Sequence, residues 1–289
     1  LAQTSPKLGN LSSNIELHCA WIDRAQAAGA ELIIFPELSL TGYILQDLVP
    51  DLAISLSQTS VLQPLLDRAQ NIACIFGFVE LSDNFNFYNS AAYASEGTIR
   101  HVHRKLYLPT YGMFDEKRFF AQGEALRTFQ TAWGELGILI CEDMWHPSTI
   151  HLLALEGASA IIVPSCSPGR GIRGDNLFAT SEGWENLLKT AAQFQTVYNL
   201  YVNRVGFEDG AHFPGGSMVV DPSGMVVARA KYFEEDLLLY EYDGSVERAT
   251  PLAVALPATT EEVVALVRWA RDNDVDIVPR GAGTGLSGG

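Results

Sequence analysis

The chain has 289 residues, of which 47% are hydrophobic and 18% are charged. This composition is typical of a globular protein, and the length suits one large domain or two modest ones. A net charge of −15 disfavours nucleic acids and anionic membranes as partners, because phosphate groups attract clustered Lys and Arg. No apolar run approaches the roughly 20 residues that span a bilayer, and no signal peptide is visible, so we expect a cytoplasmic protein.

The cysteines lie at Cys19, Cys74, Cys141 and Cys166. None of them forms a C-x-x-C pair or has a His-rich neighbourhood, so we expect neither a zinc site nor a disulfide framework. A reducing cytoplasm fits this pattern.

Short apolar runs alternate with amphipathic segments over about the first 245 residues. The first helix is expected to begin at a capping box of Ser13 and Glu16 and to end at Gly29. Further helices are expected over 52–70, 147–157 and 181–199, and a turn is expected at 221–224. The apolar runs predict buried strands at Leu32–Phe35, Ala73–Val79, Ser90–Ala94, Gly137–Ile140, Ala160–Val163, Leu200–Val205 and Ser217–Val220. Strands mixed with helices in this way predict an α/β protein whose sheets carry helices on at least one face.

The character of the sequence changes near residues 242–250. A new unit is expected to begin at Pro251, with a capping box of Thr259 and Glu262 and a helix whose Val264, Val267 and Ala270 face inward. An apolar strand at Val275–Val278 and a glycine-rich stretch follow. Some forty residues make too small a core to fold alone in most cases.

Three polar residues follow predicted strands. Glu37 and Cys141 each follow an apolar run, and Lys105 follows the strand-like Thr98–His103. Carboxyl ends of strands are where α/β sheets collect ligands, and a carboxylate, an ammonium and a thiol would supply a base, an electrostatic stabiliser and a nucleophile. Taken singly, each residue has an ordinary interpretation as a turn residue, a solvated lysine or a small buried hydrophobe.

The segments around these residues resemble a known family. Residues 35–43 (FPELSLTGY), 104–112 (RKLYLPTYG) and 139–145 (LICEDMW) resemble the glutamate, lysine and cysteine segments of the nitrilase, or carbon–nitrogen hydrolase, superfamily. They occur in the family's order and at similar intervals. The resemblance implies a four-layer α-β-β-α sandwich for residues 1–243, followed by a linker at 244–250 and a short C-terminal α/β appendage.

The same resemblance implies the chemistry. Glu37 would act as general base, Cys141 as nucleophile, and Lys105 with the backbone N–H of Glu142 would stabilise the oxyanion. Glu116 occupies the place of a second active-site glutamate. No metal or organic cofactor is required. The partners implied are a small amide substrate and further copies of the chain, as a homodimer or larger homo-oligomer.

Residues 109–120 (PTYGMFDEKRFF) resemble most closely the glutaminase domains of glutamine-dependent NAD synthetases and their stand-alone relatives. Residues 164–171 (PSCSPGRG) replace the Asn-containing segment expected there, and the sequence contains no synthetase domain. We therefore expect a stand-alone amidase, ω-amidase- or glutaminase-like, that releases ammonia through a thioester. Cleavage of a small nitrile is the alternative, and a catalytically silent binding module is a more distant one.

Four further residues are candidates for substrate contacts: Tyr111, Cys166, Arg170 and Trp184. Arg170 and Arg173 would suit a substrate carboxylate, although a solvated loop is the simpler interpretation. Core packing is the simpler interpretation for Trp184 and Cys166, and packing under a loop suits Tyr111 equally well.

The C-terminal segment resembles a different family. Residues 258–263 and 278–289 resemble the opening of an FAD-linked oxidase domain of the glycolate-oxidase-subunit type. In that family the glycine-rich loop approaches the flavin pyrophosphate, because glycine permits close backbone approach. Residues 251–289 cover only the beginning of such a domain, so we expect a truncated fragment without FAD. An FAD-dependent oxidoreductase remains a distant alternative.

Overall fold

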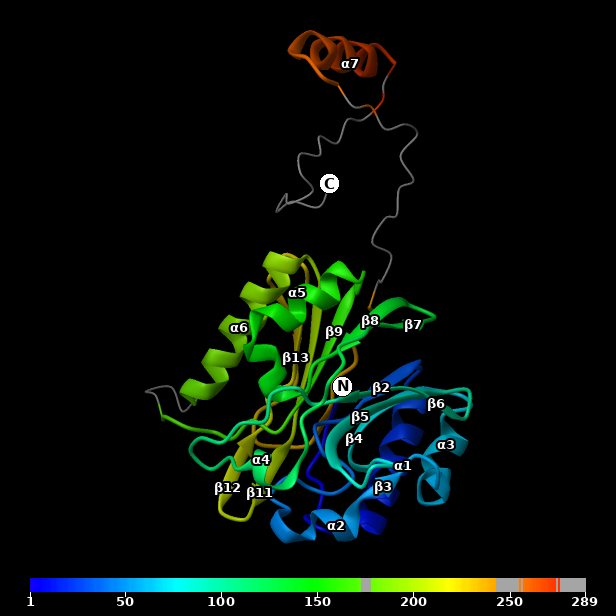
Figure 1. The fold of residues 1–289 in the computed structure, drawn as a ribbon, viewed down its shortest axis with the longest axis vertical. Coiled ribbons are helices and arrows are strands. Elements are labelled where there is room, and N and C mark those ends of the chain that lie inside the picture. Colours follow the sequence, from blue (N-terminus) through cyan, green and yellow to red (C-terminus); the bar gives the residue numbers. More distant parts are fainter. Residues whose placement is uncertain (173–177, 243–254, 256, 274, 276–289) are drawn as a thin grey trace. The chain divides into compact units, whose positions relative to one another are not determined.

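The computed structural model describes residues 1–172, 178–242, 255, 257–273 and 275 (Figure 1). The chain divides into two compact units, residues 1–244 and 245–289.

The first unit contains two large sheets. The five-stranded sheet has the order β2 (Leu32–Ile34), β4 (Ala73–Leu81), β5 (Phe87–Ser95) and β6 (Thr98–Arg104), with β3 (Ile54–Ser55) also paired to β4. Strand β2 runs parallel to β4, whereas β4, β5 and β6 form antiparallel pairs.

The six-stranded sheet has the order β14 (Val226–Arg229), β13 (Met218–Val220), β10 (Tyr198–Asn203), β9 (Ala160–Ser165), β8 (Gly134–Ile138) and β7 (Phe129–Thr131). Its three central strands are parallel, and the outer pairs are antiparallel. Two small ribbons join β1 (Ala2–Gln3) to β15 (Asp236–Leu237) and β11 (Val205–Glu208) to β12 (Ala211–Pro214).

The helices of this unit differ in length. The long ones are α1 (Leu11–Ala27), α5 (Pro147–Leu155) and α6 (Ala179–Gln195), and the short ones are α2 (Val49–Leu52), α3 (Gln63–Arg68) and α4 (Glu116–Phe119). Its described residues also form three 3₁₀ turns, η1 (Gln46–Leu48), η2 (Thr59–Leu62) and η3 (Cys141–Trp145).

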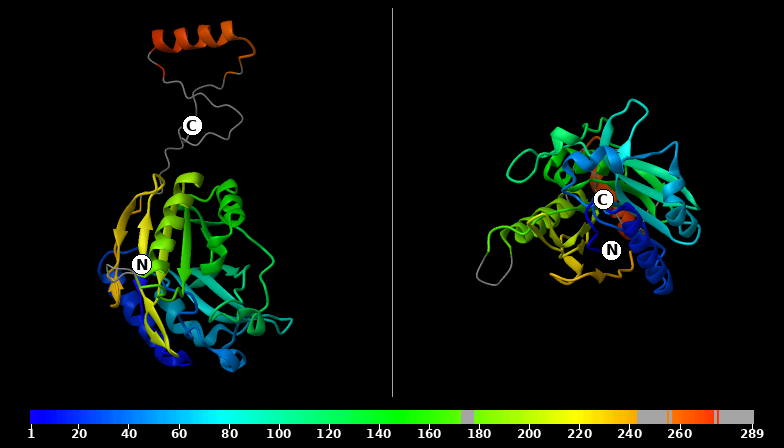
Figure 2. Two further views of the ribbon diagram at one scale, coloured as in Figure 1. Left: turned by 90° about the vertical axis from the view of Figure 1, so that its left-hand side faces the viewer. Right: turned by 90° about the horizontal axis from the view of Figure 1, so that it is seen from below.

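The buried apolar residues show how these elements are layered. Ile75 and Tyr93 of the five-stranded sheet share one core with Ile138 and Leu200 of the six-stranded sheet, and Leu188 of α6 joins that core. A second core places Ile15 and Ile22 of α1 and Leu65 of α3 against Ile33 and Phe76. Figures 1 and 2 show α5 and α6 along the six-stranded sheet and α1 beside the other sheet. The expected α-β-β-α sandwich is thus confirmed.

Two sequence predictions about helices were wrong in detail. Helix α1 is capped by Asn10, whose side chain accepts the Ser13 N–H at 3.1 Å, so Ser13 lies inside the helix and not at its cap. Residues 52–70 do not form one helix, because Ile54–Ser55 pairs with β4. Pro64 is confined to a first helical turn, so α3 begins only at Gln63.

Other predictions were confirmed. Helices α5 and α6 lie within two to four residues of the expected bounds, and Gly29 ends α1 with φ +82°. The turn at 221–224 connects β13 to β14, with Gly224 at φ +81°. The predicted strand Leu200–Val205 is correct only in part, because β10 ends at Asn203 and Val205 begins β11.

The second unit contributes α7 (Thr260–Asp272). The Thr259 side chain accepts the Glu262 N–H at 3.2 Å, and the Glu262 carboxylate accepts the Ala258 N–H at 2.7 Å, so the predicted cap is present with a shifted partner. Ala270 is 3% exposed, as predicted, whereas Val264 and Val267 are 41% and 50% exposed, so their predicted inward orientation is wrong. Helix α7 is the one regular element described in this unit. The expected strand lies outside the described residues except for Val275.

Candidate active site

Glu37, Lys105 and Cys141 meet where the two sheets approach each other. Glu37 lies three residues beyond β2, and Lys105 directly follows β6, both in the five-stranded sheet. Cys141 lies three residues beyond β8 of the other sheet and begins η3. All three side chains are buried. The Lys105 ammonium donates to Glu37 Oε1 at 2.6 Å.

Glu116 completes the charged cluster. Lys105 Nζ also donates to Glu116 Oε1 at 2.7 Å, and the Tyr43 hydroxyl donates to the same oxygen at 2.5 Å. Burial alone would lower the pKa of Lys105, but the Glu116 and Glu37 carboxylates outweigh it and hold that pKa well above its ordinary value. Burial raises the pKa of Glu116 to about 7 against the opposing effect of Lys105. Glu116 Oε2 is buried without a hydrogen-bond partner.

Glu37 is fixed by contacts on both carboxylate oxygens. Its Oε1 also accepts the Asn89 side-chain amide at 2.8 Å, and its Oε2 accepts the Cys166 N–H at 2.8 Å. The segment that carries Glu37 crosses closely over β4. A Cβ at Gly77 would lie 2.3 Å from the Leu38 nitrogen, so only glycine permits this approach.

Cys141 occupies a tight strand-to-helix turn with φ +48°, a conformation that costs a non-glycine residue about 1 kcal/mol or more. Burial raises the pKa of its thiol well above the ordinary value, Glu37 raises it further, and Lys105 lowers it. The thiol is therefore protonated at rest and needs a base to become nucleophilic. The adjacent N–H of Glu142 lies in the first turn of η3, where it has no acceptor within the helix.

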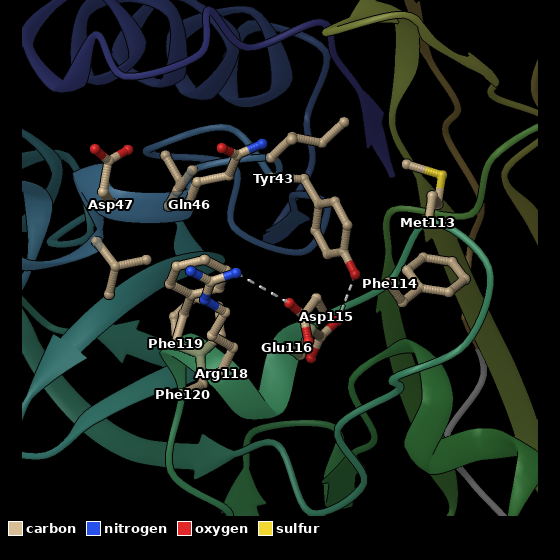
Figure 3. Close-up of a pocket in the computed structure, with 13 residues that line it drawn as sticks. Tyr43, Gln46, Asp47, Met113, Phe114, Asp115, Glu116, Arg118, Phe119 and Phe120 are labelled. Carbon is tan, nitrogen blue, oxygen red and sulfur yellow. Dashed lines mark hydrogen bonds and ion pairs between the residues drawn. The ribbon is translucent and has the colours of Figure 1, made fainter.

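A cavity of about 430 Å³ adjoins this cluster (Figure 3). Tyr43 and Glu116 line it, together with Phe114, Phe119 and Arg118. Glu37, Lys105 and Cys141 are not among its lining residues, so the cavity adjoins the cluster through Tyr43 and Glu116. In Figure 3 the Tyr43 hydroxyl points toward Glu116.

The remaining candidate residues have varied surroundings. The Tyr111 hydroxyl donates to the Glu142 carboxylate at 2.7 Å on an exposed surface. Cys166 is buried directly beneath Glu37, and its thiol contacts the Glu37 carbonyl oxygen at 3.1 Å. Arg170 lies 5.4 Å from the Phe114 ring. Trp184 is buried and donates to the Ser167 hydroxyl at 2.7 Å. Arg173 lies outside the described residues.

Sequence reasoning missed Tyr43 and Asn89. Tyr43 closes the segment 35–43, whose aromatic end gave no sign of a polar role. Asn89 lies within β5, and besides binding Glu37 it accepts the Lys105 N–H on its carbonyl at 2.8 Å. Nothing in the local pattern distinguishes it from any other polar residue of a strand.

The described residues contain neither a metal-ligand cluster nor a disulfide. No group of three or more metal-binding side chains occurs among them, and their four cysteines are free thiols. No helix in the described part of the chain has the length and apolarity to cross a membrane.

The fold and this cluster together define a nitrilase-type hydrolase. Residues 1–251 match the family described as carbon-nitrogen hydrolase, and the chain belongs to that family. It is therefore an enzyme of carbon–nitrogen bond hydrolysis, as the sequence predicted. Residues 251–289 match an FAD binding domain. Its glycine-rich segment lies outside the described residues, so we assign no step of the reaction to a flavin.

Curated relatives support this placement. The chain is 33% identical to the glutamine-dependent NAD(+) synthetase of Acinetobacter baylyi, over 100% of this chain and 52% of the relative. It is 34% identical to the Thermotoga maritima enzyme of that name, over 84% of this chain and 41% of the relative. The chain thus spans about half the length of the curated relatives it matches.

Solved structures agree. The glutamine-dependent NAD+ synthetase of Acinetobacter baumannii superposes with a TM-score of 0.73 at 33% identity, covering 82% of this chain and 43% of that one. An amidase from Nesterenkonia sp. AN1, with acrylamide added at its active-site cysteine, gives a TM-score of 0.72 at 25% identity and covers 86% of this chain and 95% of that one. A carbon-nitrogen hydrolase from Helicobacter pylori G27 gives 0.74 at 25% identity, with coverages of 82% and 86%.

Proposed function

We propose that this chain hydrolyses the C–N bond of a small ω-amide, in a glutaminase-like reaction that releases ammonia. The observation that carries the proposal is the Lys105 ammonium, held at 2.6 and 2.7 Å between the Glu37 and Glu116 carboxylates beside the Cys141 thiol. This cluster contains a base, a fixed positive charge and a nucleophile in one buried place.

Acylation begins with the protonated thiol. Glu37 takes the Cys141 proton as the sulfur attacks the amide carbonyl carbon, and the carbonyl π electrons move onto oxygen. Lys105 and the Glu142 N–H stabilise this oxyanion, whose charge exists only on approach to the transition state. Glu37 then returns the proton to the departing nitrogen, the C–N bond breaks, and ammonia leaves a thioester on Cys141.

Deacylation reverses these roles with water. Glu37 takes a proton from water, whose oxygen attacks the thioester carbonyl, and the carbon–sulfur bond breaks with the proton passing to sulfur. The unpaired Glu116 Oε2 is available to accept a hydrogen bond from this water. The products are the carboxylic acid and the regenerated thiol.

The test measures ammonia release by wild type, Cys141→Ala and the control Cys19→Ala, whose thiol lies in the core beneath α1. The substrates are ω-amides including glutamine, short aliphatic amides, carbamoyl compounds and nitriles. We expect wild type and Cys19→Ala to release ammonia from ω-amides and Cys141→Ala to release none. Ammonia from nitriles alone would replace the amidase assignment with a nitrilase, and equal release by Cys141→Ala would refute the proposed nucleophile.

A further inference from the structure

The Asp143 carboxylate joins the chain segments that carry Lys105 and Cys141. Its Oδ1 accepts the backbone N–H groups of Leu106 at 2.9 Å and Tyr107 at 2.8 Å, immediately after Lys105. Its Oδ2 accepts the N–H of Ile140 at 3.1 Å, immediately before Cys141. The side chain is fully buried.

A fourth contact comes from β6. His103 Nε2 lies 2.9 Å from Asp143 Oδ2, and His103 is itself buried two residues before Lys105. An ionised carboxylate offers about four acceptor positions; here three of them face backbone N–H groups and the fourth faces the His103 ring nitrogen. The chain is therefore bound to the Asp143 carboxylate on both sides of Lys105, through the His103 ring before it and the backbone amides of Leu106 and Tyr107 after it.

This arrangement matters because the two functional residues come from different sheets. Lys105 follows β6 of the five-stranded sheet, and Cys141 follows β8 of the six-stranded sheet. Backbone pairing within one sheet cannot fix a distance to a residue that extends from the other. Asp143 does so with hydrogen bonds to both segments, and charge-assisted bonds of this kind are the strong ones.

We propose that Asp143 is a positioning residue that sets the place of the Lys105 ammonium relative to the Cys141 thiol. This inference rests on the proposed function, in which Lys105 stabilises the oxyanion formed on attack by Cys141. Asp143 touches neither substrate nor thiol in that scheme, and acts through the two residues that do. Misplacing a catalytic group by about 1 Å costs on the order of 100-fold in rate.

The principal variant is Asp143→Asn, which keeps the shape of the side chain. Its amide has a single acceptor oxygen, so at least one backbone N–H, that of Ile140 or those of Leu106 and Tyr107, faces an NH₂ group that cannot accept. We expect kcat for ammonia release to fall about 100-fold with KM nearly unchanged. The control is Asp221→Asn, which alters an aspartate that accepts the N–H groups of Ser223 and Met225 in a remote turn. We expect this control to retain wild-type kcat.

A second measurement separates positioning from simple loss of charge. The rate at which iodoacetamide alkylates Cys141 is followed against pH, with Cys141→Ala as the blank. The charged groups that act on this thiol from the neighbouring segments are Glu37, Lys105 and Glu116. Lys105 lowers the thiol pKa, so displacement of Lys105 moves the inflection to higher pH. Loss of the Asp143 negative charge without displacement of Lys105 would instead move the inflection to lower pH.

If Asp143→Asn does not fold, His103→Leu and His103→Gln carry the same test. His103→Leu removes the ring nitrogen that contacts Asp143, and we expect it to raise the pH of the alkylation inflection by a smaller amount than Asp143→Asn does. His103→Gln keeps a side-chain N–H, and we expect it to return the inflection to the wild-type pH.

An unchanged kcat and inflection in Asp143→Asn, an inflection moved to lower pH, or an unchanged inflection in His103→Leu would each overturn the inference. Ammonia release by Cys141→Ala at the wild-type rate would instead refute the proposed function. An inactive Cys141→Ala beside a fully active Asp143→Asn would refute the positioning role alone.

Discussion

Glu116 makes the stability of the protein depend on pH in an unusual direction. Its carboxyl is buried, and burial raises its pKa from 4.5 to about 7. A folded-state pKa above the unfolded value means that the folded protein binds the proton more tightly. The contribution of Glu116 to the free energy of unfolding is therefore fully present below about pH 4.5 and is lost as the pH rises from 4.5 to about 7.

The size of the effect follows from the two pKa values. A rise from 4.5 to about 7 corresponds to about 3 kcal/mol between the limits of low and high pH. Replacing Glu116 with glutamine removes this dependence, because glutamine does not ionise. Its carbonyl oxygen still accepts from Lys105 and Tyr43, so the hydrogen bonds that hold the cluster remain.

The assay is urea unfolding followed by tryptophan fluorescence, for wild type and Glu116→Gln at several values between about pH 5 and pH 8. We expect the free energy of unfolding of the variant to rise relative to wild type by about 2 kcal/mol across this range. Glu156→Gln, which changes an exposed carboxylate at the end of α5, serves as control. A difference between wild type and Glu116→Gln that stays constant with pH would refute the reasoning, since Glu116 would then titrate alike in both states.

Two further predictions concern packing and assembly. Gly77→Ala places a Cβ 2.3 Å from the Leu38 nitrogen, so we expect the free energy of unfolding in urea to fall by about 1–3 kcal/mol and ammonia release to be reduced. The control is Gly183→Ala in α6, where a Cβ would meet only the Trp145 ring at an ordinary contact distance of 3.7 Å, so we expect a neutral or stabilising effect. Equal stabilities of the two variants would contradict the close-approach argument. We also propose that the exposed apolar residues Leu155 of α5 and Phe194 of α6, 70% and 63% exposed, bind a second copy of the chain. Sedimentation should give a dimer or larger for wild type and a smaller species for Leu155→Glu, and a wild-type mass of one 31.5 kDa chain would contradict this.

The strands that carry the site could be predicted from the sequence. Apolar runs before Glu37 and Cys141 marked β2 and β8, because strands buried on both faces need continuous hydrophobic residues. The segments around Glu37, Lys105 and Cys141 identified the family, since three such sequence motifs in the family's order are far more specific than any single residue. The broken helix at 52–70 was missed because Ile54–Ser55 gains its partner, β4, from sequence about 25 residues away.

Contacts between distant segments account for the parts of the site that the sequence did not indicate. Asn89 is 52 residues from the Glu37 carboxylate it binds, and Tyr43 is 73 residues from Glu116. A polar residue inside a strand has no local feature that shows which segment will pack against it. Asp143 stood inside a recognised segment, yet its role depends on amides of residues 106 and 107.

The buried Lys105 explains why Glu116 belongs with the other three residues. An isolated ammonium is costly to bury, and a single partner compensates it only when further hydrogen bonds satisfy the remaining donors. Lys105 has two carboxylate partners, Glu37 and Glu116. In the proposed reaction Glu37 is the base, so it gains a proton during each half of the cycle. When Glu37 is protonated, its charge no longer balances Lys105. Above about pH 7, where Glu116 is ionised, it then remains as the compensating carboxylate, so the ammonium stays charged at the moment when the oxyanion needs it.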